Sequence, residues 1–124
     1  MLFRLQKAAS IAGVPHVFPP ERYPYPDEAI RERWREMTGR VFVAERDGEP
    51  VGVAAVEAEW LNGLYVHPDQ WGTGAADRLH DAAIEAIAAA LDEARLWVLE
   101  ENRRARRFYE RHGWVVNGES RVVE

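Results

Sequence analysis

Apolar and polar positions in the first third of the chain predict two helices separated by a loop. Residues 2–12 space their apolar side chains like a short amphipathic helix. Residues 15–26 are rich in proline, with aromatic residues between, and are expected to form an irregular loop. Asp27 is then a plausible N-cap of a second helix that ends at Gly39. Its apolar stripe would be Ile30, Trp34 and Met37.

After residue 40 the pattern changes to the alternation of strands. Asp47-Gly48 is a strong hairpin signal, and Glu57-Ala58-Glu59 marks a second bend. The segments that these turns separate predict an antiparallel meander within 41–66, with strands at 41–44, 51–56 and 60–66.

The remaining chain returns to helical spacing, interrupted by short apolar runs. Residues 75–91 predict a helix with one apolar face, and 102–112 predict another that Gly113 closes. Residues 96–99 are interpreted as a buried strand, and 114–116 as the start of a further strand.

Composition limits the class of protein. A chain of 124 residues is expected to form one domain, spanning 1–124. The net charge of −5 argues against nucleic acid as a partner. Cysteine is absent, which excludes disulfides and suits a reducing compartment. No apolar run is long enough to span a bilayer. We therefore expect a soluble, cytoplasmic protein with no membrane partner.

The stretch 64–76 has the order strand, turn, glycines and helix, which is typical of anion binding. A helix N-terminus offers unpaired N–H groups, and Gly72 and Gly74 lack the Cβ atoms that would keep a phosphate away. A dinucleotide fingerprint is rejected, because its third glycine would fall at Asp77. A P-loop is rejected because no Lys-Ser/Thr pair follows. The alternative is that both glycines only make a tight connection.

The stretch 102–114 combines an amide with a phenol. Asn102 and Tyr109 are two helical turns apart on one face, with the small Ala105 between them. Asn102 also has a structural interpretation as an N-cap, and Tyr109 as a half-buried aromatic residue. The arginines of this stretch form a solvated face, or in part attract a polyanion through Arg103 or Arg104.

Together the two stretches resemble the GNAT superfamily of N-acetyltransferases. The resemblance rests on Leu-Tyr-Val-His-Pro at 64–68, Trp-Gly-Thr-Gly-Ala-Ala at 71–76 and Asn-x-x-Ala-x-x-Phe-Tyr-Glu-x-x-Gly-aromatic at 102–114. It implies an α/β fold of the α+β type, with a mixed, mostly antiparallel sheet flanked by helices. The core would be 41–116, and 1–40 would be a helical and proline-rich region on the acceptor side. Two strands, ending at Val66 and spanning 96–99, would splay apart around the coenzyme.

The resemblance also implies the site. Acetyl-CoA is the expected co-substrate, with its pantetheine along Leu64, Tyr65 and Val66. Its pyrophosphate would lie on the amides of Trp71, Gly72, Thr73, Gly74, Ala75 and Ala76, with Asp77 as a further contact. Asn102 would bind the pantetheine arm or the CoA backbone, and Tyr109 would face the thioester sulfur. Trp71 departs from the Arg or Gln that is usual there.

The implied reaction is direct attack of a neutral amine on the thioester, with Tyr109 as the catalytic residue that stabilises the thiolate. The amine would belong to a small molecule or to a protein. No base is evident: Glu57, Glu59 and a water relay are candidates, and Asn62 could orient the substrate. The alternative function is a catalytically weak CoA-binding module with a regulatory or assembly role. A third is a small-molecule-binding protein without CoA.

Two further expectations follow. The first and last strands of the family pattern are missing from the sequence, so an edge of the sheet would be open and a homodimer would cover it. The histidines, His16, His67, His80 and His112, are isolated in the sequence and lack metal-ligand spacing, so we expect structural or exposed roles and no metal.

Overall fold

The computed structural model describes residues 4, 6–9, 27–36 and 39–117. Residues 4 and 6–9 are helical, which agrees with the first predicted helix. The second helix, α2 (Asp27–Glu36), begins at Asp27, whose carboxylate lies 3.1 Å from the ammonium of Lys7. The predicted loop at 15–26 and Met37 lie outside the described residues.

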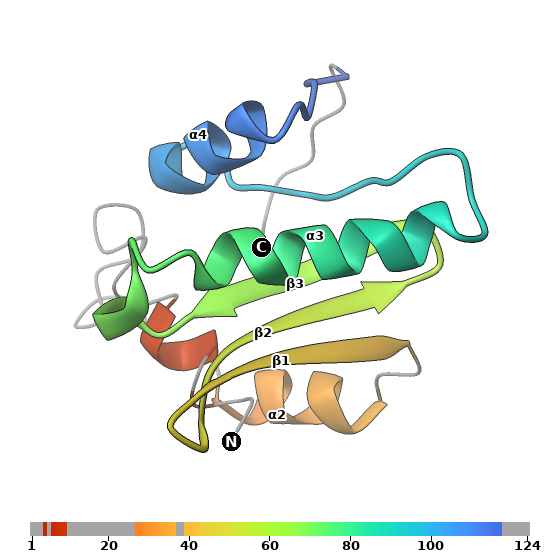
Figure 1. Cartoon of the computed structure of the whole chain (residues 1–124). Coiled ribbons are helices and arrows are strands. Elements are labelled where there is room, and N and C mark those ends of the chain that lie inside the picture. The colour runs from red at the N-terminus through yellow and green to blue at the C-terminus, as the bar shows by residue number, and fades with distance from the viewer. Residues whose placement is uncertain (1–3, 5, 10–26, 37–38, 118–124) are drawn as a thin grey trace.

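An antiparallel meander forms the sheet, as predicted, in the order β1 (Arg40–Arg46), β2 (Glu49–Glu57) and β3 (Trp60–Val66). Asp47 and Gly48 take the left-handed φ values of 54° and 81° that a tight hairpin turn requires. Ala58 turns the second hairpin with φ 50°, in a region that costs an L-residue about 1–2 kcal/mol. Figure 1 shows the sheet with α2 beside β1.

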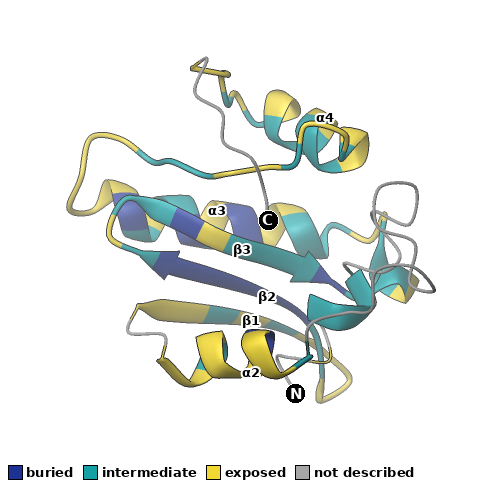
Figure 2. Ribbon diagram, turned by 180° about the vertical axis from the view of Figure 1, so that it is seen from behind, coloured by how far each residue is buried: buried dark blue, intermediate teal, exposed yellow. Residues whose placement is uncertain are grey.

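Helix α3 (Ala75–Ala88) packs across the sheet and contacts all three strands. Burial is greatest along β2, where Val53 and Ala54 are fully buried (Figure 2). The helix ends three residues before Leu91, where the sequence predicted its end. Leu91 is 42 % exposed and gains no packing that would prolong the helix. The shared core consists of Ala54, Val56, Leu61, Val66, Leu79, Ala83 and Ile87.

The last helix, α4 (Arg103–Arg111), is one residue shorter at each end than the predicted 102–112. The side chain of Asn102 caps it by accepting a hydrogen bond from the N–H of Ala105 at 3.2 Å. Gly113 follows with φ 88°, a conformation that terminates helices. Both α3 and α4 begin on the same side of the molecule (Figure 1).

The predicted strand at 96–99 is wrong. This segment touches the sheet through a single parallel bridge between Trp60 and Arg95, and beyond it Trp97 and Val98 are 42 % and 37 % exposed. Trp97 instead stacks on Trp60, with ring centroids 6.2 Å apart. The apolar run therefore reflects a ring stack at the sheet edge rather than a buried ladder.

The predicted strand at 114–116 is also wrong. Its residues are irregular, and Val115 and Val116 are 88 % and 73 % exposed. Strand propensity alone does not fix a strand, because the ladder needs a neighbour with free backbone groups. Within the described residues no strand lies beside this segment.

Candidate functional site

The connection from β3 to α3 is a tight loop with two left-handed glycines. A single 3-10 turn, Pro68–Gln70, is followed by Gly72 with φ 82° and Gly74 with φ 89°. A Cβ built on either glycine would meet no atom of the described residues within 4 Å. The left-handed backbone, rather than crowding inside the chain, is therefore what requires glycine at both positions.

Several N–H groups of this loop have no acceptor among the described residues. The amides of Trp71 and Thr73 are used in turns, bonding to Pro68 O at 3.2 Å and Gln70 O at 3.4 Å. The first intrahelical bond of α3 runs from Arg78 to Gly74 O at 3.1 Å. In the described part of the chain no acceptor faces a set of N–H groups that we call the loop amides, those of Gly72, Gly74, Ala75, Ala76 and Asp77.

The loop amides make an anion-binding site in physical terms. They combine unpaired donors with the positive end of the dipole of α3, a helix of 14 residues. The carboxylate of Asp77 would oppose an anion there, but it bonds instead to Nε2 of His112 at 2.8 Å. Its charge is therefore shared with a partner from the end of α4.

The outer edge of β3 changes register at a β-bulge. Leu61 and Gly63 oppose neighbouring residues of β2, so Asn62 is an extra residue in the strand. Before the bulge, the N–H of Leu61 points outward and donates to Arg95 O at 2.9 Å. Asn62, a candidate for orienting the substrate, is exposed at the bulge.

After the bulge the outward-facing groups belong to other residues. The N–H of His67 donates to Val51 O of β2 at 2.8 Å. Because peptide groups alternate in direction along a strand, the N–H and C=O groups of Leu64 and Val66 point away from β2. The indole N–H of Trp71 reaches Val66 O from that outer side at 2.9 Å. The side chain of Trp71 thereby closes the end of the exposed edge.

Tyr109 lies on the inner face of α4. Its ring packs edge-on against Phe108 and Trp114, with centroids 5.3 Å and 5.8 Å away. Burial, and then the neighbouring phenol of Tyr65, raise the pKa of Tyr109 above its ordinary value. The ring of Tyr65 is folded over Gly63, where an added Cβ would lie 2.5 Å from it. Tyr109 is therefore a protonated donor at neutral pH.

The other candidates have mainly structural roles in the described contacts. Asn102 uses Oδ1 as the N-cap and keeps its amide N–H groups for other partners. Glu57 ends β2 and packs over Gly39, where an added Cβ would lie 2.5 Å from its Cγ. Glu59 lies in the turn that precedes β3, at the opposite end of that strand from the loop amides. The described contacts of Glu57 and Glu59 give neither carboxylate the position of a catalytic base.

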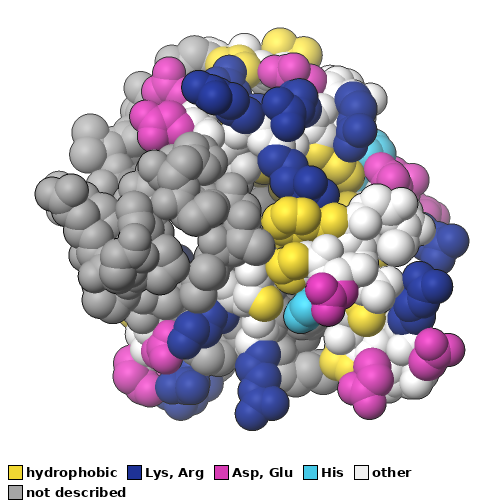
Figure 3. All heavy atoms as spheres, turned by 90° about the vertical axis from the view of Figure 1, so that its left-hand side faces the viewer, with side chains coloured by type: hydrophobic (Ala, Val, Ile, Leu, Met, Phe, Trp, Pro, Cys, Tyr) yellow, Lys and Arg dark blue, Asp and Glu magenta, His cyan; other side chains and the backbone are white. Residues whose placement is uncertain are grey.

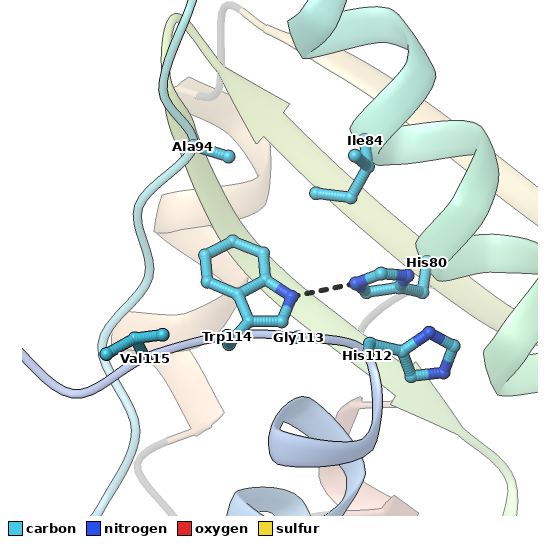
Figure 4. A pocket seen from close by; sticks show the side chains of 7 residues that line it. All are labelled: His80, Ile84, Ala94, His112, Gly113, Trp114 and Val115. Atoms are coloured by element: carbon cyan, nitrogen blue, oxygen red, sulfur yellow. Dashed lines mark hydrogen bonds between the residues drawn. The ribbon is translucent and has the colours of Figure 1, made fainter.

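The structure also contains a histidine cluster that the sequence did not predict. His80 is buried in α3, and its ring centroid lies 4.1 Å from that of His112. Nε2 of His80 accepts from the indole N–H of Trp114 at 2.8 Å (Figure 4). Nδ1 of His80 lies 3.1 Å from the carboxylate of Asp81. Only the spacing of Asp77, His80 and Asp81 on one helix face signalled it in the sequence.

This cluster has the residue types of a metal site, but the protonation of His80 does not suit metal binding. Ligand atoms of His80, Asp81 and His112 lie within 4.8 Å of one another. However, the N–H of Trp114 needs the Nε2 lone pair of His80, so a neutral His80 carries its proton on Nδ1. That nitrogen then donates to Asp81 and has no lone pair for a metal. The cluster joins α3 to the end of α4.

The hollow beside this cluster lies apart from the predicted site. It has a volume of about 290 Å³, and Figure 4 shows Trp114 and Ile84 facing each other across it. None of the residues assigned to the coenzyme or to catalysis lines it. The lining is His80, Ile84, Ala94, His112, Gly113, Trp114 and Val115.

Residues 6–114 match the model of the acetyltransferase (GNAT) family. The chain belongs to this family. The resemblance drawn from the two sequence motifs is therefore confirmed, and the match extends over both of them.

Curated N-acetyltransferases share part of the chain. An uncharacterized N-acetyltransferase of Archaeoglobus fulgidus is 38 % identical over 81 residues, which cover 56 % of this chain and 55 % of the relative. One from Mycobacterium tuberculosis strain H37Rv is 37 % identical over 86 residues, covering 63 % and 54 %. The chain thus spans about half the length of the curated relatives it matches.

Solved structures confirm the GNAT fold. The apo form of YjaB from Escherichia coli aligns with a TM-score of 0.80 and 23 % identity, over 99 % of this chain and 80 % of that one. PaiA N-acetyltransferase from Thermoplasma acidophilum, in complex with coenzyme A, aligns with a TM-score of 0.76 and 18 % identity, over 96 % and 84 %. The expected α+β class is confirmed. No described helix has the length and apolar character needed to cross a membrane.

Proposed function

We propose that the chain is an acetyl-CoA-dependent N-acetyltransferase that transfers an acetyl group to a primary amine by direct attack. The observation that carries the proposal is the set of loop amides at the start of α3, which meet no acceptor in the described chain. They lie at the end of β3, where the strand also presents outward backbone groups. A pyrophosphate joined to an extended amide-bearing arm fits both features.

Each part of the coenzyme has a partner of matching chemistry. The loop amides would bind the pyrophosphate, whereas the N–H groups of Trp71 and Thr73 are already bonded within turns. The outward C=O of Leu64 and N–H of Val66 would pair with the amides of pantetheine, as an added strand would, while Val66 O is already bonded to the indole N–H of Trp71. Tyr65 lies between them in the strand. The free amide N–H groups of Asn102 would donate to the same arm.

The reaction needs an oxyanion donor and a group that stabilises the leaving thiolate. A neutral amine would attack the carbonyl carbon, forming the C–N bond, and the C–S bond would break to release CoA thiolate. The outward N–H of Leu64, which lies farther along β3 from the loop amides than Val66, is the donor that the strand geometry favours for the oxyanion. Tyr109 would donate a hydrogen bond to the thiolate sulfur.

Tyr109 is better suited to hydrogen bonding than to full proton transfer. The ordinary pKa of a phenol is already higher than that of a thiol, so proton transfer from the phenol to the thiolate is uphill by about 2 kcal/mol. Burial raises the pKa of Tyr109 further, which makes the transfer still less favourable. The thiolate would take its proton from solvent or from the ammonium that amine attack creates.

The amine must lose a proton, and its class decides how much help it needs. An α-amine, with a pKa near ~7.7–8.0, is partly neutral at physiological pH, whereas a lysine amine near ~10.4 is almost fully charged. Water can relay the proton from an α-amine. Glu57 and Glu59 are the alternatives for a more basic amine. A small molecule and a protein N-terminus both fit the proposal.

The test is thiol release from acetyl-CoA with a panel of amines. The proposal expects release that depends on an amine and falls in Tyr109→Phe. The second candidate, a CoA-binding module without turnover, is favoured by the missing strands at 96–99 and 114–116. CoA binding with no thiol release on any amine would support that module. No binding of CoA would overturn both.

We also propose a homodimer in a cytoplasmic setting. Strand β1 is an open edge within the described sheet, and Val41 and Val43 on it are 38 % and 40 % exposed. Exposed edges of this kind pair readily with a second copy. Light scattering at micromolar concentration should give twice the chain mass of 14.2 kDa. A monomer at that concentration would contradict the proposal.

A further inference from the structure

A cation from α4 is held over the loop that precedes α3. The guanidinium carbon of Arg104 lies 3.8 Å from the centre of the Trp71 indole. This contact joins the two segments that carry the sequence motifs. A cation over an indole face gains about 0.5–1 kcal/mol at an exposed site, so Arg104 is kept at the loop.

Trp71 is a fixed support for this cation. Its indole N–H donates to Val66 O at 2.9 Å, and its ring packs against the hydrophobic core. The indole is therefore tied to both the end of β3 and the core under α3. A side chain stacked on it has a defined position relative to the loop amides, the first of which belongs to the next residue, Gly72.

The charge of Arg104 is not neutralised by the described residues. None of their carboxylates forms an ion pair with it. Burial, and then repulsion from Arg107 and Arg111, lower the pKa of Arg104 below its ordinary value. Figure 3 shows basic side chains gathered over α4 on the side where α3 and α4 begin. An anion placed there would relieve this repulsion.

We propose that Arg104, positioned on the indole of Trp71, binds a phosphate group of the coenzyme beside the loop amides. Stacking uses only the face of the guanidinium, and its N–H donors lie in the plane, free to grip two phosphate oxygens at once. Arg104 thus adds a full positive charge to a site whose other donors are neutral amides. This inference rests on the proposed function, since it needs a phosphorylated coenzyme.

The test compares Arg104→Gln with Arg103→Gln by isothermal titration with CoA, dephospho-CoA and pantetheine. Arg103 is the matched control, because it is exposed, adjacent and equally charged but has no stacking partner among the described residues. We expect Kd for CoA to rise about tenfold in Arg104→Gln and less than twofold in Arg103→Gln. Pantetheine, which carries no phosphate, should bind both variants like the wild type.

The phosphate contacted follows from dephospho-CoA, which lacks the 3′-phosphate. If Arg104→Gln and wild type bind dephospho-CoA with the same Kd, Arg104 contacts the 3′-phosphate. If the variant still binds dephospho-CoA more weakly than wild type, Arg104 contacts the pyrophosphate. Trp71→Leu should weaken CoA binding as Arg104→Gln does, and the double variant should be no weaker than either. Circular dichroism would verify that Trp71→Leu is folded.

Two results would overturn the inference. One is an equal loss of CoA affinity in Arg104→Gln and Arg103→Gln, which would reduce the effect to general electrostatics. The other is unchanged CoA affinity in Arg104→Gln. If wild type itself fails to bind CoA, the proposed function fails as well, so the two failures are distinguishable.

Discussion

The indole N–H of Trp114 donates to Nε2 of the buried His80 at 2.8 Å, across 34 residues of sequence. This bond requires an unprotonated Nε2. It therefore fixes the neutral form of His80 at the contact between α3 and the end of α4. Protonation of His80 would leave two donors facing each other.

The stability of the protein should consequently fall as the pH drops below about 6.5. Burial is the main cause that lowers the pKa of His80, ahead of the opposing effect of Asp81 and the repulsion from His112. A group whose pKa is lowered in the folded state binds more protons when unfolded, so acid favours unfolding. The loss begins near the unfolded value of 6.5 and ends at the lowered folded value.

Urea unfolding at pH 7.5 and at pH 5.5 checks this expectation. His80→Gln keeps an acceptor for Trp114 and a donor for Asp81 but cannot titrate. The fall in unfolding free energy between the two pH values should be smaller in this variant than in wild type, with Asp77 and His112 unchanged in both. Equal losses in the two proteins would show that His80 does not carry the acid sensitivity.

Tyr109→Phe should lower kcat about tenfold to a hundredfold while leaving the KM for acetyl-CoA within twofold. The variant removes a hydrogen bond that forms fully only as the thiolate departs, and such donors act on the chemical step. The packing against Trp114 and Phe108 is retained, so stability should change little. Steady-state thiol release at saturating amine measures it. A change confined to KM would assign Tyr109 to binding instead.

Gly74→Ala should weaken CoA binding through the loop amides. Alanine at φ 89° is strained by about 1–2 kcal/mol, so the loop would distort to relieve it. Gly48→Ala is a matched control, because Gly48 has φ 81° and equally open surroundings but lies in the β1–β2 hairpin. Both variants should lose similar stability in urea, and only Gly74→Ala should lose CoA affinity. Parallel losses of affinity would show that global destabilisation is responsible.

Asn102→Ser separates capping from coenzyme contact. Serine caps a helix as well as asparagine does, so the unfolding free energy should stay within about 0.5 kcal/mol of wild type. It lacks the amide N–H groups that Oδ1 capping leaves over. We expect the Kd for CoA to rise about threefold to tenfold. Titration calorimetry with unchanged affinity would leave Asn102 with the N-cap alone.

Local signals in the sequence were sufficient for the parts of the fold that local chemistry determines. The turn at Asp47-Gly48, the cap at Asn102 and the stop at Gly113 each require particular backbone angles or side-chain acceptors. The apolar positions that alternate along 41–66 form one face of the sheet, and the apolar stripe of α3 packs against that face. These elements were predicted because a single pattern fixes each of them.

The failures share one physical cause, which is dependence on a distant partner. The run at 96–99 is as apolar as a strand, yet Trp97 finds Trp60 rather than a ladder. His80 and Trp114 belong to different elements, so their contact leaves no spacing in the sequence. The stack of Arg104 on Trp71 is of the same kind. The sequence predicted the loop of the candidate site and its glycines. It did not predict the side-chain contacts that join α4 and the residues after it to α3 and its preceding loop.

The central claim is that the loop amides and the outer edge of β3 bind acetyl-CoA. Amide chemical-shift mapping during titration with CoA tests it most directly, because each N–H reports on its own environment. The account predicts that the largest shifts at saturation fall on Gly72, Gly74 and Ala75–Asp77, followed by Leu64 and Val66. Shifts centred instead on the hollow beside Trp114, or no shifts at millimolar CoA, would contradict it.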